Sequence, residues 1–360
     1  AVPCQYWHHA ADTEAQNPYH RVFTQKDCKE MTKVSVLIAV YNTEKYLHEC
    51  LDSLLHQTLE EWEAICVDDA STDGSWAILQ DYAAKDGRFK VVRLKENHGQ
   101  AFARNKALAL SQGEYISFLD SDDWLARDAL EKVVSCFEAN LMTDCVLFQL
   151  RYFSDNDGRH TEWDYPQPHF GVMSGKEAFR LSLNWSIHGV YVVKAELHRR
   201  YPYDDSSRWY SDDNTTRLHY FASREVRECQ GVYYYRQHSS SVSHAVDVHR
   251  FDYLEANASM RKMLLAMHSP KDVLDEYEIC RWKVVVGMYM FYYKYRHELA
   301  SKDRKTGLEK IKQAWKSIDP HTVRKHFGTK YGYCPLRFSW KLFRLQEEIY
   351  FSLRKLIGRL

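Results

Sequence analysis

The chain has 360 residues, enough for one large domain with an appendage or for two domains. Its 49 basic and 49 acidic side chains balance, so net charge gives no argument for a nucleic-acid partner. Aromatic residues make up 14% of the chain, and ring-rich surfaces suit carbohydrate, although aromatic side chains also fill cores.

Nine cysteines are scattered along the chain, and none forms a Cys-x-x-Cys spacing. This pattern predicts reduced thiols in a cytoplasmic protein and argues against a zinc site or a disulfide framework. No run approaches the roughly 20 apolar residues of a membrane span. Residues 1–30 are polar and lack the apolar centre of a signal peptide. We expect them to form an extension or a loosely packed arm before a functional start near Met31.

Strand-like and helix-like segments alternate over the first 140 residues. Apolar, largely β-branched runs predict buried strands at 34–41, 64–67, 89–94 and 115–119. Segments with a helical apolar stripe lie between them, at about 46–55, 75–82 and 99–110, and a further helix is expected over 128–140. Short connections between alternating elements predict an α/β fold, with a mainly parallel sheet flanked by helices.

The second half reads less regularly. We expect strands at 145–152, 190–193 and 232–235, a loop over 154–171, and helices that begin at a Ser174–Glu177 capping box and near residue 214. From about residue 248 the pattern is helical. The predicted regions are an N-terminal extension at 1–30, an α/β domain at 31–245, and a helical C-terminal region at 246–360.

Polar clusters follow three of the first four predicted strands, at Tyr41-Asn42, Asp68-Asp69 and Asp120 to Asp123. Ligands bind beyond the carboxyl ends of strands in such sheets, so one crevice collects all three clusters. Neighbouring carboxylates repel unless a cation shares them, which favours Mg²⁺ or Mn²⁺ with substrate phosphates completing the shell. A solvated turn is the alternative for the last cluster, and helix capping is the favoured reading of Asp68 and Asp73.

These runs resemble the family 2 glycosyltransferases, enzymes of the GT-A fold that transfer a sugar from a nucleotide donor with inversion. The resemblance covers about residues 33–240 and leaves out the C-terminal third. The matching runs are Val34–Asn42, Tyr46–Thr58, Val67–Ser75, Asn97–Asn105 and Gly113–Trp124.

The resemblance implies a nucleotide-sugar site. Asp69 would accept from the uracil N3–H, which points to a UDP-sugar, and Arg104 would lie near the donor phosphates. Ala39, where the family often has Pro, would line the base pocket with Tyr41 and Asn42. Asp120, Asp122 and Asp123 match the metal and ribose motif, and the last two are the expected ligands of Mn²⁺ or Mg²⁺.

The resemblance also implies a general base. Asp213 matches the base position, but Asp212 stands where the family usually has Glu, which leaves open which of the two acts. Without the resemblance, paired Asp residues at a helix start are ordinary capping chemistry. Arg236 and His238 match a loop that closes over the diphosphate; the Arg would pair with phosphate and the His would ligate the ion, although a lone His is more often structural.

The acceptor region is the least readable. Trp185, His188 and Trp209 are candidates for an acceptor wall by ring stacking, with core packing as the default alternative. Leu342, Leu345, Ile349, Leu353 and Leu356 recur at helical spacing among basic residues, which suits a helix lying on an anionic membrane. Packing of that helix on its own domain is the alternative. We expect a cytoplasmic enzyme, peripheral at the inner membrane face if the helix binds lipid.

The sequence therefore predicts a metal-assisted, inverting hexosyltransferase that extends a surface or capsular glycan from a UDP-sugar onto a saccharide or lipid-linked saccharide, without nucleic acid. One alternative is a sugar-1-phosphate nucleotidyltransferase, but 41–45 lacks the Gly-rich loop that grips a triphosphate. A non-catalytic glycan-binding protein is a second, against which the retained acids argue. The donor sugar, the acceptor and the linkage are not readable.

Overall fold

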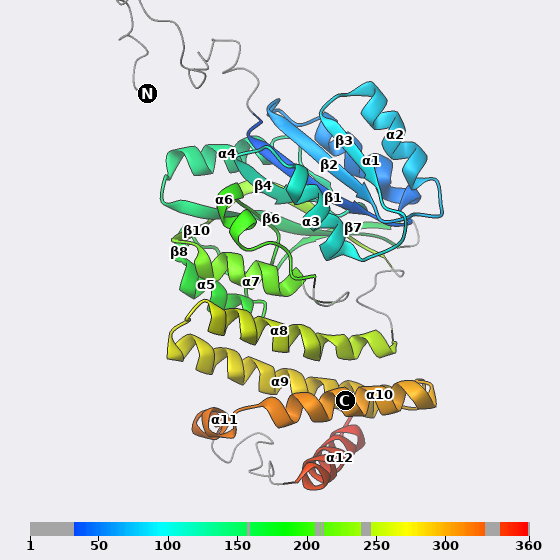
Figure 1. Cartoon of the computed structure of the whole chain (residues 1–360), viewed down its shortest axis with the longest axis vertical. Helices are drawn as coiled ribbons and strands as arrows, with labels where there is room; N and C mark the ends of the chain where they lie inside the picture. The colour runs from blue at the N-terminus through cyan, green and yellow to red at the C-terminus, as the bar shows by residue number, and fades with distance from the viewer. Residues whose placement is uncertain are drawn as a thin grey trace, which may run out of the picture. The chain divides into compact units, whose positions relative to one another are not determined.

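The computed structural model describes residues 32–156, 159–205, 210, 212–238, 246–327 and 339–358. Thr32–Leu360 belongs to one compact unit. A mixed β-sheet with helices on both faces makes up its first part, and a stack of helices follows (Figure 1). Strand β1 begins the sheet with a run of seven residues that are almost fully buried, as its continuous apolar sequence predicts.

The described strands form one ten-stranded sheet in the order β3-β2-β1-β4-β9-β6-β10-β5, with β7 paired to β6 and β8 to β10. Strands β3, β2, β1 and β4 are parallel, β9 is antiparallel to β4 and β6, and β10 runs parallel to β6. The strands are β1 Val34–Val40, β2 Trp62–Asp68, β3 Phe89–Arg93, β4 Tyr115–Phe118, β5 Trp124–Leu125, β6 Thr143–Asn156, β7 Arg159–Asp164, β8 Val172–Ser174, β9 Tyr191–Lys194 and β10 Glu225–Gln237.

Helices cover both faces of the sheet and continue beyond it. Helices α1, α2 and α4 pack on one face and α3, α5 and α7 on the other, each through buried apolar side chains. The helices are α1 Glu44–Leu55, α2 Ser75–Lys85, α3 Gln100–Leu110, α4 Ala129–Ala139, α5 Gly175–Ser182, α6 Ala195–Arg200, α7 Asp212–Ala222, the 3-10 helix η3 Val248–Asp252, α8 Tyr253–Ala266, α9 Lys271–Tyr295, α10 Ser301–Ser317, α11 Pro320–Phe327 and α12 Trp340–Leu356.

The predicted elements of the first half and the α/β fold class are confirmed. Ser174 caps α5 by accepting from the Glu177 N–H at 3.3 Å, as the capping box predicts. Close packing of β4 against β1 depends on Gly113, because a Cβ there would lie 2.6 Å from the backbone nitrogen of Ser35. That approach sets the carboxyl end of β4 next to the end of β1.

The predicted loop over 154–171 is wrong in part. Strand β6 runs on to Asn156, and β7 pairs back on it antiparallel. The segment 159–164 is mostly polar and has no apolar alternation, so side-chain pattern gives no strand signal there. This segment is a strand because its backbone pairs with the long strand β6.

The C-terminal helices share a core of their own. Trp282 and Tyr289 of α9 pack with Trp315 of α10 and with Phe343 and Phe351 of α12. Their rings meet at centroid distances of 5.7 to 5.9 Å, for example between Tyr289 and Phe343 and between Trp315 and Phe343. No helix among the described residues is both long and apolar enough to cross a membrane.

Candidate functional site

The loops after β1 and β2 are tied together by side chains. Asn42 adopts a left-handed conformation, with φ 52°, and its Oδ1 accepts from the Thr72 N–H at 2.8 Å. Its own N–H donates to Ser71 Oγ at 3.0 Å. Tyr41 is 48% exposed beside it, and Ala39 is half-buried on β1. The two strand ends therefore present one surface, on which the Tyr41 ring is accessible.

Asp69, at the end of β2, is 3% exposed and holds the loop that precedes α3. Its two carboxylate oxygens accept from the backbone N–H groups of His98 and Gly99, both at 2.8 Å. Asn97 also donates to the Asp69 carbonyl oxygen at 3.2 Å. Each carboxylate oxygen has a second lone pair, so Asp69 keeps the capacity to accept from a ligand while being fixed in place.

Arg104 of α3 is 2% exposed and forms an ion pair with Asp120, the residue two positions after β4. The Phe118 ring lies 4.4 Å from its guanidinium carbon, and Gln100 donates to the same Asp120 oxygen at 2.9 Å. Burial raises the pKa of Asp120, Arg104 opposes this rise, and the charges of Asp122 and Asp212 add to it. A buried cation thus holds the first acid of the cluster in place.

Asp123 is 1% exposed, and both of its oxygens are taken by β10. Tyr233 OH donates to Oδ2 and the Arg236 N–H donates to Oδ1, each at 2.8 Å. Burial raises the pKa of Asp123 well above its usual range, and the charges of Asp120 and Asp122 contribute. The sequence predicts Asp123 as a metal ligand, but in this arrangement its carboxylate ties β10 to the acidic loop and faces the interior.

Arg236 is also engaged within the protein. Its guanidinium pairs with Glu49 of α1, and its Nε donates to the Asp122 carbonyl oxygen at 2.9 Å. The Trp124 ring lies 4.6 Å and the Tyr46 ring 5.1 Å from the guanidinium carbon. The predicted phosphate contact would require this side chain to leave Glu49, whereas its present contacts hold the main chain of Asp122.

Asp122 and His238 are the pair of side chains that fits a cation. Asp122 Oδ2 lies 2.8 Å from His238 Nε2, and the two side chains are 29% and 17% exposed. Within the described ranges, no group of three or more His, Cys, Asp or Glu side chains converges as a metal site. A carboxylate and an imidazole suit Mn²⁺, and Mg²⁺ or Mn²⁺ ordinarily takes its remaining ligands from phosphate and water. The residues therefore fit an ion that is shared with a diphosphate.

The second acidic pair opens α7. Asp213 Oδ2 accepts from Tyr253 OH at 3.1 Å and lies 3.7 Å from the Arg217 guanidinium, one turn further along the helix. Burial raises the pKa of Asp213 to about 7; Arg217 opposes the rise and Asp212 adds to it. A carboxyl group with a pKa near neutrality is suited to accept and release a proton.

The two acidic clusters meet across the end of the sheet. The charge of Asp212 raises the pKa values of both Asp120 and Tyr203, in each case in addition to the dominant effect of burial. Asn105 of α3, next to Arg104, donates to the Tyr203 carbonyl oxygen at 2.9 Å, and Asn214 of α7, next to Asp213, donates to Asp204 Oδ2 at 2.8 Å. The Tyr203 ring lies 5.5 Å from the guanidinium carbon of Arg104. Residues 203 and 204 therefore connect the helix that holds Asp120 with the helix that begins at Asp212.

The family model of Glycosyl transferase family 2 matches residues 35–205. A Bacillus subtilis (strain 168) protein named as glycosyltransferase EpsH is 32% identical over 264 residues, which cover 69% of this chain and 72% of that protein. The chain belongs to glycosyltransferase family 2. A second B. subtilis protein, TuaG, named as a glycosyltransferase of teichuronic acid biosynthesis, is 52% identical over 99 residues, or 28% of this chain and 39% of its own length.

Solved structures confirm the GT-A fold of this glycosyltransferase. S. aureus TarS 1–349, crystallised with UDP-GlcNAc, superposes with a TM-score of 0.68 at 18% identity, covering 91% of this chain and 92% of the other. That likeness extends past the segment matched by the family model and into the C-terminal helices. It supports the sheet and helix arrangement as a whole and says nothing of individual site residues.

The predicted acceptor residues of the glycosyltransferase differ in position. His188 is 2% exposed, and burial lowers its pKa to about 3, so it is a neutral core residue that accepts from the Val190 N–H at 3.2 Å. Trp185 is half-buried, and its ring lies 4.9 Å from the guanidinium carbon of Arg217. Arg217 thus lies against both Trp185 and Asp213. Trp209 lies outside the described residues.

Three residues of the site were missed by sequence reasoning. Arg217 stands four positions after Asp213 on α7, and that helical spacing is a signal that could have identified it. Tyr233 and Tyr253 reach their acids from 110 and 40 positions away. No local pattern marks them among the 25 tyrosines of the chain.

Proposed function

We propose that this glycosyltransferase moves a sugar from a UDP-sugar to a hydroxyl group of a glycan or lipid-linked saccharide, with inversion at the anomeric carbon. One observation carries the proposal: residues 203 and 204 link the acids at the end of β4 to the acids at the start of α7. Asn105, next to Arg104, donates to the Tyr203 carbonyl oxygen at 2.9 Å, and Asn214, next to Asp213, donates to Asp204 Oδ2 at 2.8 Å. Inverting displacement needs this division, with one group near the leaving diphosphate and a base on the opposite side of the sugar.

The donor half uses the strand ends. Tyr41, with Ala39 and Asn42, borders the nucleoside, and Asp69 accepts from the uracil N3–H with its remaining lone pairs. Its two backbone hydrogen bonds fix the carboxylate before the ligand arrives, which lowers the entropic cost of binding. The complex of TarS with UDP-GlcNAc supports a UDP-sugar as the donor.

Asp122 and His238 would hold the divalent cation. When bound, Mn²⁺ or Mg²⁺ supplies positive charge against the charge that grows on the leaving diphosphate. Hydrogen bonds from β10 fix the position of Asp122. Its neighbour Asp123 accepts from Tyr233 OH and the Arg236 N–H, and Arg236 Nε donates to the Asp122 carbonyl oxygen.

Asp213 is the proposed base. Tyr253 and Arg217 both contact its Oδ2, so we assign the acceptor hydroxyl to Oδ1. The acceptor oxygen bonds to the anomeric carbon, the bond from that carbon to the UDP oxygen breaks, and its electron pair leaves with UDP. The hydroxyl proton passes to Asp213. Its pKa of about 7 allows the carboxylate to be ionised at neutral pH and still accept the proton.

The test measures UDP release from a panel of UDP-sugars with Mn²⁺, in parallel with UDP binding by calorimetry. We expect Asp213→Asn to lower transfer by about 10²- to 10⁴-fold while UDP affinity stays nearly unchanged. Asp212→Asn is the matched control and should retain most of the activity. Full activity in Asp213→Asn would exclude it as the base. If the wild-type protein binds UDP-sugars but releases no UDP, a glycan-binding protein would be favoured. Release of pyrophosphate would favour a nucleotidyltransferase.

We also propose peripheral membrane contact through α12. Phe343 and Phe351, with the partly buried Trp340, pack this helix on α9 and α10, yet five of its other apolar side chains face outward. Those side chains are Leu342, Leu345, Ile349, Leu353 and Leu356, which are 45% to 82% exposed. Lys341, Arg354 and Lys355 on the same helix would attract anionic lipid. The exposed stripe argues against the alternative in which the leucines pack on the protein itself.

Flotation with liposomes of phosphatidylglycerol and phosphatidylcholine tests the contact. Wild-type protein should float with anionic vesicles, and the double variant Leu345→Glu/Leu353→Glu should stay in solution. Substitution is preferable to truncation because removal of α12 would uncover the aromatic face of α9. Equal flotation of both proteins would rule out this helix as the lipid contact.

A further inference from the structure

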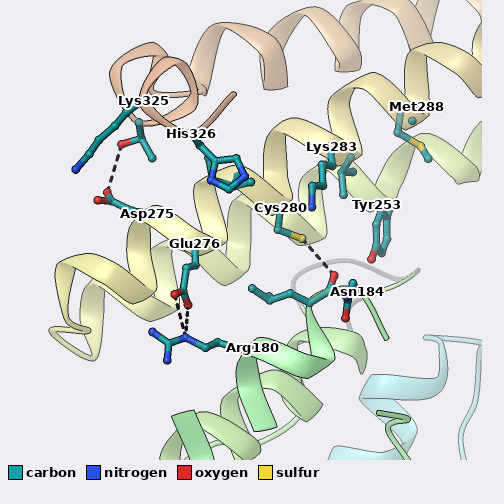
Figure 2. Close-up of a pocket in the computed structure, with 15 residues that line it drawn as sticks. Arg180, Asn184, Tyr253, Asp275, Glu276, Cys280, Lys283, Met288, Lys325 and His326 are labelled. Atoms are coloured by element: carbon teal, nitrogen blue, oxygen red, sulfur yellow. Dashed lines mark hydrogen bonds and ion pairs between the residues drawn. The ribbon is translucent and has the colours of Figure 1, made fainter. Parts of the chain in front are cut away.

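A cavity of about 820 Å³ lies beside Tyr253, which is hydrogen-bonded to the proposed base. Helices α5, α9 and α11 enclose it, and Tyr253 at the start of α8 borders it (Figure 2). None of the proposed donor or metal residues lines it. This volume is in the range of pockets that hold a small molecule or several sugar units.

The cavity shares its wall with the proposed base. Tyr253, which lines the cavity, donates to Asp213 Oδ2 at 3.1 Å. Cys280 of α9 is another lining residue, and the charge of Asp213 contributes to the raised pKa of its thiol, after burial as the main cause. A chain lying in the cavity would thus contact a residue that is hydrogen-bonded to Asp213.

The charges of the lining favour an anion. Glu276 is paired with Arg180 at 2.7 Å, and Asp275 with Lys271 at 2.9 Å, so these acids are neutralised. Lys283 and Lys325 line the cavity, and neither has an ion-pair partner within the described residues. Figure 2 shows Lys283 between Cys280 and Tyr253. Ammonium groups without an ion-pair partner, beside acids that are already paired, suit a phosphate or carboxylate ligand.

Gly287, in the interior of α9, keeps the cavity open. A Cβ built at this position meets no atom within 4 Å, so no neighbouring group requires glycine there. Glycine in a helix interior lowers stability relative to alanine, and nothing in the packing compensates for it. Its effect is to leave empty space on the wall of the cavity, where a side chain would stand in the way of a ligand.

We propose that this cavity binds the acceptor as an anionic saccharide, with Lys283 and Lys325 pairing with its phosphate or carboxylate groups and its reacting hydroxyl directed to Asp213. The assignment rests on the proposed function and deepens it, because it names the chemical class of the acceptor. The apolar side chains of Leu183, Ile279 and Met288 would lie against the sugar rings.

The test compares three fluorescently labelled hexamers: oligogalacturonate, oligo(glycerol phosphate) and neutral maltohexaose. We expect at least one anionic hexamer to bind the wild-type protein about tenfold more tightly than maltohexaose. The anionic hexamer that binds more tightly will identify the preferred group as carboxylate or phosphate. Gly287→Phe should block the cavity, and Lys283→Glu/Lys325→Glu should reverse its charge; each should weaken that binding by about tenfold or more.

Two matched controls lie away from the cavity. Gly87→Phe places the same side chain at a glycine that also has no atom within 4 Å of its Cβ, and Lys85→Glu makes one such lysine-to-glutamate reversal near the end of α2. Both should bind the hexamers like wild type. UDP affinity with Mn²⁺, measured for every variant, reports separately on the donor half. Equal affinity of the wild-type protein for all three hexamers, or unchanged hexamer binding in Gly287→Phe, would overturn the acceptor assignment even if UDP binds. A loss of UDP binding alone would instead count against the proposed donor site.

Discussion

The guanidinium of Arg217 should set the pH at which transfer becomes fast. Asp213 must be ionised to accept the acceptor proton, and its pKa is about 7. In the wild-type enzyme, kcat/KM should therefore rise about tenfold per pH unit below pH 7 and level off above it. Replacing Arg217 by Met keeps much of the buried stem and removes the charge that opposes the rise of this pKa.

The size of the effect follows from the geometry. The guanidinium lies 3.7 Å from Asp213 Oδ2, and an opposite charge at this distance lowers a carboxyl pKa by about 1 to 3 units. Arg217→Met should therefore move the midpoint of the profile up by about that amount, with activity at pH 7 reduced by about 5- to 500-fold and recovered in alkali. Tyr253→Phe removes one hydrogen bond and should shift the midpoint in the same direction by about half a unit to one unit.

The assay is UDP release at limiting acceptor across about pH 5.5 to 10.5, a range that spans the expected midpoints. Arg217 is 1% exposed, so circular dichroism and UDP binding must show that each variant is folded. Tyr253→Phe provides the milder perturbation if Arg217→Met does not fold. A midpoint that moves to lower pH, or one that does not move in either variant, would refute the assignment of Asp213 as the ionising base.

Three further results are expected. Asp122→Asn should weaken Mn²⁺-dependent UDP binding about tenfold or more in calorimetry, with metal-free binding little changed; an equal loss without metal would contradict the ligand role. Asp69→Asn replaces one of the two oxygens that accept from the N–H groups of His98 and Gly99 with a donor, and should lower the free energy of unfolding in urea by about 1 to 3 kcal/mol. An unchanged unfolding midpoint would count against these two hydrogen bonds. Because the pKa of Asp213 is raised from 3.8 to about 7, its ionisation destabilises the folded state. The contribution of this group to the free energy of unfolding is greatest below pH 3.8 and is lost as the pH rises to about 7. Asp213→Asn should therefore be about 1 to 2 kcal/mol more stable than wild type at pH 8 and equal to it near pH 3.5.

Local pattern was sufficient for the first half of the chain. The apolar run of β1 identifies a buried strand because few other elements bury seven consecutive residues. Asp73 was predicted as a capping residue, and its oxygens accept from the N–H groups of Ser75 at 3.0 Å and Glu44 at 3.1 Å. Strand β7 could not be predicted in this way, because its pairing to β6 depends on backbone groups and leaves no side-chain pattern.

The amino-acid sequence alone determined the fold class, because periodicity and short connections predict it. It also indicated the family and the acids at the strand and helix ends, because its motifs resemble those of family 2 glycosyltransferases. Only the tertiary structure decided which acid is exposed to a ligand and which is buried. Asp123 is buried and accepts hydrogen bonds from Tyr233 OH and the Arg236 N–H, and Glu49 pairs with the Arg236 guanidinium. These contacts join positions that are 110 to 187 residues apart in sequence. Burial is the main cause that raises the pKa of Asp213 to about 7, and burial cannot be read from a residue's neighbours in sequence.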